Sequence, residues 1–437
     1  MAIVAQPGGA APLIAPGGSP AADTSVADKR RLLLAGVGVL FVLSVVRVVT
    51  DVPDLTSSGT FEGALRLAVP IGLAGLGGLY AERSGVVNIG LEGMMILGTW
   101  FGAYAGWQWG PWWGVVAGVL GGAAGGLVHA IATVTFEVDH IVSGVAINIL
   151  GAGMARFLSS IAYSADTGGG ITQSPIVPGH IGTFTFPVLS GGRLFGWKSP
   201  DILGSLEDKR WFFVSDAAGA LHGLTGNLSF LTIIAVALVP FSWWLLWRTR
   251  FGLRLRSVGE NPSAAESLGV PVYTMKYIAV TISGALAGLA GAFLALVSTS
   301  LYKEGQTANR GFIGLAAMIF GNWRPAGIAA GAGLFGFADA LQLRSNDAVH
   351  SLLLFVGVIV GVFAILAVRR RRSALRSSLL FAVAAGFILW YFATDKVPEQ
   401  FVFCTPYVVT LVVLASASQR LRPPAADGLR YRKGQIT

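Results

Sequence analysis

Long apolar runs, separated by short polar or glycine- and proline-rich stretches, repeat along most of this 437-residue chain. A helix needs about 20 mostly apolar residues to cross a bilayer, and most of these runs reach that length. The pattern therefore predicts an all-α, polytopic membrane protein with about twelve spans. The expected spans are residues 32–50, 61–80, 86–107, 112–134, 140–158, 229–247, 277–298, 308–321, 325–343, 351–368, 377–393 and 401–418.

The expected span 308–321 is unusual because only about ten of its residues, half of a normal span, are apolar. The polar sequence GNWRP follows it at once. A broken or half-spanning helix is tolerated only where it is buried in protein or lines a cavity. The glycine-rich stretch 84–93, just after the second span, interrupts the helical pattern in a similar way. Both stretches are predicted to lie beside a pathway through the membrane.

The composition supports lipid as the surrounding solvent and narrows the chemistry. Only 12% of the residues are charged and 54% are hydrophobic, whereas soluble domains carry about 25% charged residues. The 59 glycines suit close contact between membrane helices. One cysteine excludes an intrachain disulfide. The net charge of +9 indicates basic loops between spans rather than a nucleic-acid partner.

Basic residues gather in the segments that the span pattern places on one side of the membrane. These segments are residues 29–31, 248–276, 369–376 and 420–433. Loop 51–60, on the other side, has no Lys or Arg. Cytoplasmic enrichment in Lys and Arg sets orientation, so we expect both termini in the cytoplasm and loop 159–228 outside. Residues 1–28 are rich in Ala, Gly and Pro without periodicity, which predicts a disordered cytoplasmic tail over 1–31.

The basic segment 248–276 is predicted to carry a short helix of its own. Asn261 or Ser263 can cap its start, Pro262 fits its first turn, and Glu266 completes capping-box spacing with Ser263. Gly269 then favours a stop after about two turns. A short helix between two spans can press on a partner protein, or it can be an ordinary amphipathic loop helix. The residues alone do not separate these interpretations.

Three polar residues within the apolar runs are candidates for the solute pathway. Asn88 and Glu92 are four residues apart and would share a helical face if Asn88 begins the helix. Glu92 could instead pair with a neighbour such as Arg83. Asn148 is expected near the middle of its span, either as a hydrogen-bond partner between helices or as a pathway residue.

The sequence offers little for catalysis or metal binding. No G-x-x-x-x-G-K-[ST] phosphate loop is present, and the nearest approach, GGRLFGWKS at 191–199, has an extra Trp. His129, Glu137, Asp139 and His140 cluster near an inner turn but lack metal-ligand spacing. No spacing suggests a nucleophilic triad. We therefore expect no cofactor, no metal and no enzymatic site, and ATP, if used, must be hydrolysed by another chain.

Several ordered blocks resemble a known family of permeases. They are AERSGVVNIGLEGMMILG (81–98), DHIVSGVAINILGAG (139–153), WRTRFGLRLRSVGENPSAAESLGV (247–270), SGALAGLAGAFLAL (283–296) and GFIGLAAMIFGNWRPAGIAAGAGLFGFADALQLR (311–344). Together they resemble permease subunits of bacterial ABC importers of the purine-nucleoside type, within the branched-chain amino acid and ribose permease superfamily. The resemblance implies a location in the bacterial cell membrane. It also implies three partners: a sister permease, a cytoplasmic ABC ATPase and an extracytoplasmic solute-binding lipoprotein.

The resemblance favours segment 248–276 as the coupling element that docks the ATPase. Its expected coupling residues are Arg254, Arg256, Gly259, Glu260, Asn261, Pro262, Ala264, Ala265 and Gly269. The two arginines could contact an acidic groove of the ATPase, or could simply be positive-inside charges.

One region departs from the family pattern. The permease core is expected over 32–344, and residues 345–397 are an apparent insertion of two spans before the last span and basic tail at 398–437. An even number of added crossings keeps the sides of a core of about ten spans. Two alternatives to nucleosides remain at this point. One is an ABC permease for simple sugars or branched-chain amino acids, and the other is an ion-coupled secondary carrier.

Overall fold

The computed structural model describes residues 26–164, 168–194, 197–369, 373–398 and 421–434. The expected last span, 401–418, and most of the expected N-terminal tail lie outside these residues. The described part is mostly helical, with 72% helix and 2% strand, which confirms the predicted all-α class.

The main helices follow the apolar runs. They are α1 (Val26–Thr50), α2 (Ser58–Glu82), α3 (Leu91–Trp109), α4 (Pro111–Ala130), α5 (His140–Ala162), α8 (Phe230–Arg248), α11 (Val272–Phe293), α13 (Pro325–Arg344), α14 (Asn346–Arg369) and α15 (Ala374–Ala393). Among the described residues, seven helices are long and apolar enough to cross a membrane. The chain is therefore a multi-pass membrane protein.

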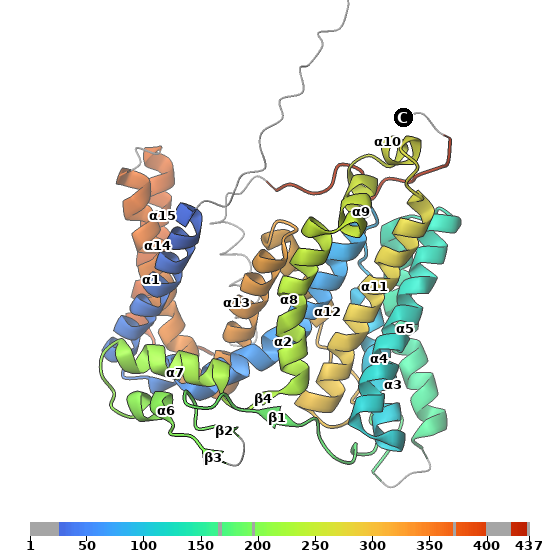
Figure 1. Ribbon diagram of the computed structural model, residues 1–437. Coiled ribbons are helices and arrows are strands. Elements are labelled where there is room, and N and C mark those ends of the chain that lie inside the picture. The colour runs from blue at the N-terminus through green and yellow to red at the C-terminus, as the bar shows by residue number, and fades with distance from the viewer. Residues whose placement is uncertain (1–25, 165–167, 195–196, 370–372, 399–420, 435–437) are drawn as a thin grey trace, which may run out of the picture.

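Helix α2 lies at the centre of the bundle, where it packs against α11, α12 (Arg310–Phe320) and α13. Helices α3, α4 and α11 all pack against one another, and α5 packs against α3. On one side of the bundle, α1 and α15 pack against α14, as Figure 1 shows. Residues 345–397, which the sequence analysis predicted to be an insertion of two spans, contain α14 and α15.

The two ends of the bundle carry different small elements. One end holds α6 (Ile202–Glu207), α7 (Val214–Thr225) and four short strands, β1 (Thr183–Phe184), β2 (Arg193–Leu194), β3 (Trp197–Lys198) and β4 (Leu228–Ser229). The opposite end holds α9 (Arg250–Glu260), α10 (Pro262–Ser267) and residues 421–434 (Figure 1). We call these the α7 end and the α10 end. Loop 159–228 and segment 248–276 thus lie at opposite ends, as the span pattern predicts.

Three boundaries differ from the sequence predictions. Helix α1 begins at Val26, so residues 26–31 are helical and do not belong to a disordered tail. The span expected from residue 86 begins at Leu91, because Gly85 adopts a left-handed φ of 80° and starts a turn. Helix α9 is a separate helix that the basic sequence of segment 248–276 did not predict.

Glycines bring α4 and α11 into backbone contact. A Cβ atom on Gly122 would lie 2.3 Å from the carbonyl oxygen of Gly284, and one on Gly288 would lie 2.3 Å from that of Gly118. No larger residue fits at these distances. At this interface, glycines therefore allow two membrane helices to approach closely.

Candidate functional site

Helices α9 and α10 form a compact corner at the α10 end. Thr249 accepts a hydrogen bond from the backbone N–H of Gly252 and caps α9. Asn261 ends α9 and caps α10, where its Oδ1 accepts from the N–H of Ala264 at 2.9 Å. Gly269 follows with a φ of 79°. Of the two predicted caps, Asn261 is the one at the start of α10, and the predicted stop at Gly269 is confirmed.

Some of the coupling residues predicted on α10 are buried against the bundle, and others are exposed. Ala265 is buried beneath the helix, against Val258 and Met275. Ala264 is exposed on the opposite face. Leu268, directly after α10, is 85% exposed, so an apolar side chain projects from a polar turn. We did not predict Leu268 as a site residue, although an apolar residue directly before the stop glycine is a usable signal.

The other predicted coupling residues have different surroundings. Arg254 is exposed. Arg256, by contrast, folds back on α8, because its Nε donates to the carbonyl of Leu246 at 3.0 Å and its guanidinium lies over the Trp247 ring. Gly259 is buried against the α2–α3 turn. Glu260 forms an ion pair of 3.8 Å with Arg83 of that turn.

The turn between α2 and α3 is a break in an otherwise helical run. Asn88 is fully buried within it, donating from Nδ2 to the Ser283 hydroxyl at 2.8 Å. Its Oδ1 accepts from the N–H of Gly90 at 3.0 Å, and Gly90 is the residue that precedes α3. The expectation that Asn88 begins the helix and shares a face with Glu92 is therefore wrong. Asn88 stabilises the break itself.

Glu92 caps a different helix. Its two carboxylate oxygens accept from the backbone N–H groups of Asn309 at 3.0 Å and Gly311 at 2.7 Å. These groups lie at the start of α12, where the helix dipole favours negative charge. The suggested pairing of Glu92 with Arg83 is not formed, since Arg83 pairs with Glu260. Glu92 thus joins the first turn of α3 to α12.

Helix α12 is the half-length helix expected at 308–321. Its 11 residues extend about 16 Å at 1.5 Å per residue, roughly half of a bilayer core. Gly311 sits so close to Glu92 that a Cβ there would lie 2.6 Å from the Glu92 Cα. The first N–H groups of this half-length helix are therefore bound by a carboxylate of the protein itself.

Asn148 connects α5 to the same break. Its Oδ1 accepts from the N–H of Gly93 at 2.7 Å, and its Nδ2 donates to the carbonyl of Ile89 at 3.0 Å. The first contact joins α5 to α3, and the second joins α5 to the turn before α3, so Asn148 makes the interhelical hydrogen bond that was one of its two expected roles. Nearby, His129 bonds the Ser143 hydroxyl at 2.8 Å, so this cluster ties α4 to α5.

A small polar cavity opens at the α7 end. It has a volume of about 230 Å³ and lies between α2, α8 and the end of the α11 segment. Glu62, Arg66, His180 and Asn227 are among its lining residues. Arg66 is exposed and donates to the carbonyl of Val297. A charged residue within a span is unusual, so this cavity is a candidate entrance for a polar solute.

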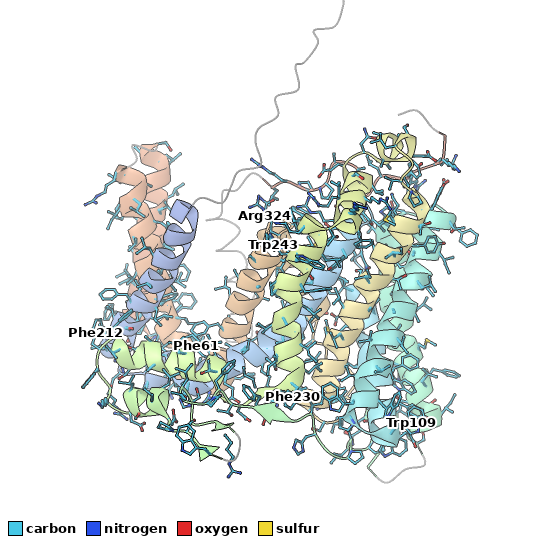
Figure 2. The ribbon with its side chains drawn as sticks, in the orientation of Figure 1. Phe61, Trp109, Phe212, Phe230, Trp243 and Arg324 are labelled. Carbon is cyan, nitrogen blue, oxygen red and sulfur yellow. The ribbon has the colours of Figure 1, made fainter. Side chains whose placement is uncertain are left out.

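Aromatic residues mark the two ends of the spans. In Figure 2, Trp109 and Phe230 lie near the α7 end, whereas Trp243 and Arg324 lie nearer the α10 end. Trp109 is 66% exposed. Exposed tryptophans at both ends of apolar helices are typical of the two membrane–water interfaces. Long apolar helices, a broken span and a half-length helix together define the class, a polytopic membrane permease.

Comparison with known proteins agrees with this class. Residues 60–363 match the family described as the permease component of the branched-chain amino acid transport system, and the chain belongs to this family. A guanosine ABC transporter permease protein, NupQ, from Bacillus subtilis is 32% identical over 375 residues, which cover 84% of this chain and 94% of the relative. No solved structure matches the chain.

Two further relatives are similar over different lengths. The nucleoside ABC transporter permease protein NupC from Lactococcus lactis is 32% identical over 376 residues, 84% of this chain and 95% of its own length. A protein of Haloferax volcanii that carries a provisional glucose ABC transporter permease name, TsgC13, is 36% identical over 295 residues, 67% of this chain and 79% of its own. Permeases of ABC transporters work with an ATPase and, in importers, with a solute-binding protein.

Proposed function

We propose that this chain is the membrane subunit of an ATP-driven importer of nucleosides. The observation that carries the proposal is the extent of similarity to the two permeases with nucleoside names, which covers 84% of this chain and nearly the whole of each relative. The permease with a glucose name is similar over a shorter part, 67% of the chain. A simple sugar is therefore the second candidate solute.

We propose that a partner ATPase docks on α10. The exposed Leu268 supplies an apolar anchor, and the exposed Arg254 of α9 adds a positive charge at the same end of the bundle. Apolar anchors that enter a pocket of the partner carry most of the energy of such interfaces. Because the sequence has no phosphate loop, ATP is hydrolysed by that partner. The α10 end then faces the cytoplasm, with both termini, and the α7 end faces outward.

For the solute pathway, we propose the region of the break before α3 and the half-helix α12. Asn88, Glu92 and Asn148 belong to this region, and each already makes hydrogen bonds within the protein. They hold the break in this conformation. A solute passing here would replace some of those hydrogen bonds when the subunit changes conformation. The small cavity near Arg66 is the proposed outer entrance.

The test is reconstitution of the full chain with the ATPase and sister permease that copurify with it, together with its solute-binding protein. In proteoliposomes, we expect uptake of labelled guanosine or adenosine against a gradient, dependent on ATP, with little competition from glucose, ribose or leucine. Competition by glucose alone would identify a sugar permease. Uphill uptake driven by a proton gradient, with no ATPase present, would replace the proposal by a secondary carrier.

A pair of matched variants tests the docking face. Leu268→Asp should weaken recovery of the ATPase by at least about tenfold, because a buried interface anchor is worth roughly 2 kcal/mol or more. Leu221→Asp makes the same change at an exposed leucine of α7, at the other end of the bundle. It should leave recovery of the ATPase unchanged. Equal recovery with both variants would show that α10 is not the docking element.

A further inference from the structure

Residues 421–434 run across the α10 end of the bundle, beside α9 and α10 (Figure 1). The backbone N–H of Arg422 donates to Oδ1 of Asn322, in the turn between α12 and α13, at 2.9 Å. Four residues later, the N–H of Ala426 donates to the carbonyl of Gly259, at the end of α9, at 2.9 Å. This segment therefore joins two turns that are far apart in the sequence.

The middle of the segment packs on the break before α3. A Cβ atom on Gly85 would lie 3.0 Å from the carbonyl oxygen of Ala426, and one on Gly428 would touch Val87 at 3.5 Å. Asp427 faces the carboxyl group of Glu82. The turn that holds Asn88 is thus covered directly by these residues.

The last part of the segment packs against the buried side of α10. Tyr431 is only 8% exposed and belongs to the apolar cluster with Val258, Ala265 and Met275. Its hydroxyl donates to Glu266 of α10 at 2.5 Å. Next to it, Arg432 forms an ion pair of 2.6 Å with Glu137, in the turn before α5.

We propose that residues 422–432 form a clasp that positions α10 and transmits its movement to the break before α3 and to the α12–α13 turn. The proposal rests on the function proposed above, in which an ATPase acts on α10. Helix α10 has only six residues, and a helix this short does not keep its place without packing. Tyr431 adds to the packing that Val258 and Met275 give Ala265, and it holds Glu266 by a hydrogen bond. The residues of the clasp before Tyr431 contact the break before α3 and the α12–α13 turn. Tyr431 is the positioning residue of the clasp.

The clasp proposal predicts that substitution of Tyr431 lowers the amount of solute transported per ATP hydrolysed. Tyr431→Ala removes both the ring from the cluster and the hydrogen bond to Glu266. The ATPase should still bind at the exposed face and hydrolyse ATP. Tyr431→Phe loses only the bond to Glu266, so solute moved per ATP should fall by about tenfold, the effect of losing one hydrogen bond to a charged group. Tyr431→Ala also loses the ring contact and should fall further.

A matched hydroxyl deletion is available on α11. The Tyr277 hydroxyl bonds that of Thr135 outside the clasp, so Tyr277→Phe makes the same substitution and removes a hydrogen bond to a neutral partner without touching α10. We expect this control to keep the parental ratio of solute to ATP. The assay uses the complete complex in proteoliposomes and measures uptake and ATP hydrolysis in the same vesicles. The amount of ATPase recovered with each variant is measured in parallel.

The possible outcomes distinguish a failure of the clasp proposal from a failure of the proposed function. Coupled uptake by the parent, together with a parental ratio in both Tyr431 variants, would overturn the clasp alone. The clasp would also be refuted if Tyr431→Ala lost the ATPase altogether while Tyr431→Phe transported normally, since the segment would then only maintain the docking surface. Absence of any copurifying ATPase with the parent would instead remove the proposed function.

Discussion

Glu92 gives the sharpest test of the break and the half-helix. The side chain is 6% exposed, and its carboxylate accepts from the N–H groups of Asn309 and Gly311. A hydrogen bond to a charged group contributes about 1.5–3 kcal/mol, so Glu92→Ala should cost roughly 3–6 kcal/mol for the two. Glu92→Gln keeps one acceptor oxygen in nearly the same volume and should cost about half as much.

The assay is thermal unfolding of the detergent-solubilised protein, followed by size-exclusion chromatography. At about 2 °C per kcal/mol, the value for larger domains, Tm should fall by roughly 6–12 °C for Glu92→Ala. Glu304→Ala removes a carboxylate that is 41% exposed and serves as the control. A parental Tm for Glu92→Ala would refute the capping role. A parental Tm for Glu92→Gln with loss of uptake would instead indicate direct contact with the solute.

Three other predictions concern the coupling turn, the helix interface and the clasp. Gly269→Pro should uncouple ATP hydrolysis from uptake without preventing membrane insertion, because proline cannot adopt the φ of 79° found there; uptake equal to the parent would contradict this. Gly122→Leu should abolish a monodisperse elution peak, since its Cβ would already lie 2.3 Å from the Gly284 carbonyl, whereas Gly333→Leu, in open space, should not. Burial raises the pKa of Asp427 to about 6, against the hydrogen bond with Glu82 and attraction from Lys276 and Arg83, which lower it. Because the pKa is raised in the folded state, the Asp427 carboxyl stabilises the docked clasp fully below its usual pKa of 3.8. This contribution to stability is lost as pH rises through about 6. Hydrogen exchange of residues 421–434, corrected for the intrinsic rate, should therefore be slower at pH 5 than at pH 8, and Asp427→Asn should remove the difference.

Local signals in the sequence were sufficient for features that depend on neighbouring residues. The cap at Asn261, the stop at Gly269 and the short apolar run of α12 are all properties of a few consecutive positions. The alternation of spans and basic loops also predicted that segment 248–276 and loop 159–228 lie at opposite ends. Each of these follows from helix length, capping chemistry or charge, which need no knowledge of tertiary contacts.

Contacts between distant residues could not be predicted in this way. Glu92 caps a helix whose first N–H groups are 217 and 219 residues away, and an isolated sequence contains no signal for that pairing. The same holds for Tyr431 and Glu266, which are 165 residues apart. Helix α9 was missed for a different reason. Its charged residues suggested a solvated loop, whereas Leu255 and Val258 are fully buried and bind the helix to the core.

The backbone contact between α4 and α11 limits how this permease can move. A joint between bulky side chains can slip, because each side chain has other rotamers to adopt. Gly118, Gly122, Gly284 and Gly288 have no side chain to rearrange, and any sliding would drive peptide groups into one another. These two helices therefore behave as a single rigid unit. Under the proposed transport function, we expect the conformational change to take place around these two helices, at the break before α3 and at α12.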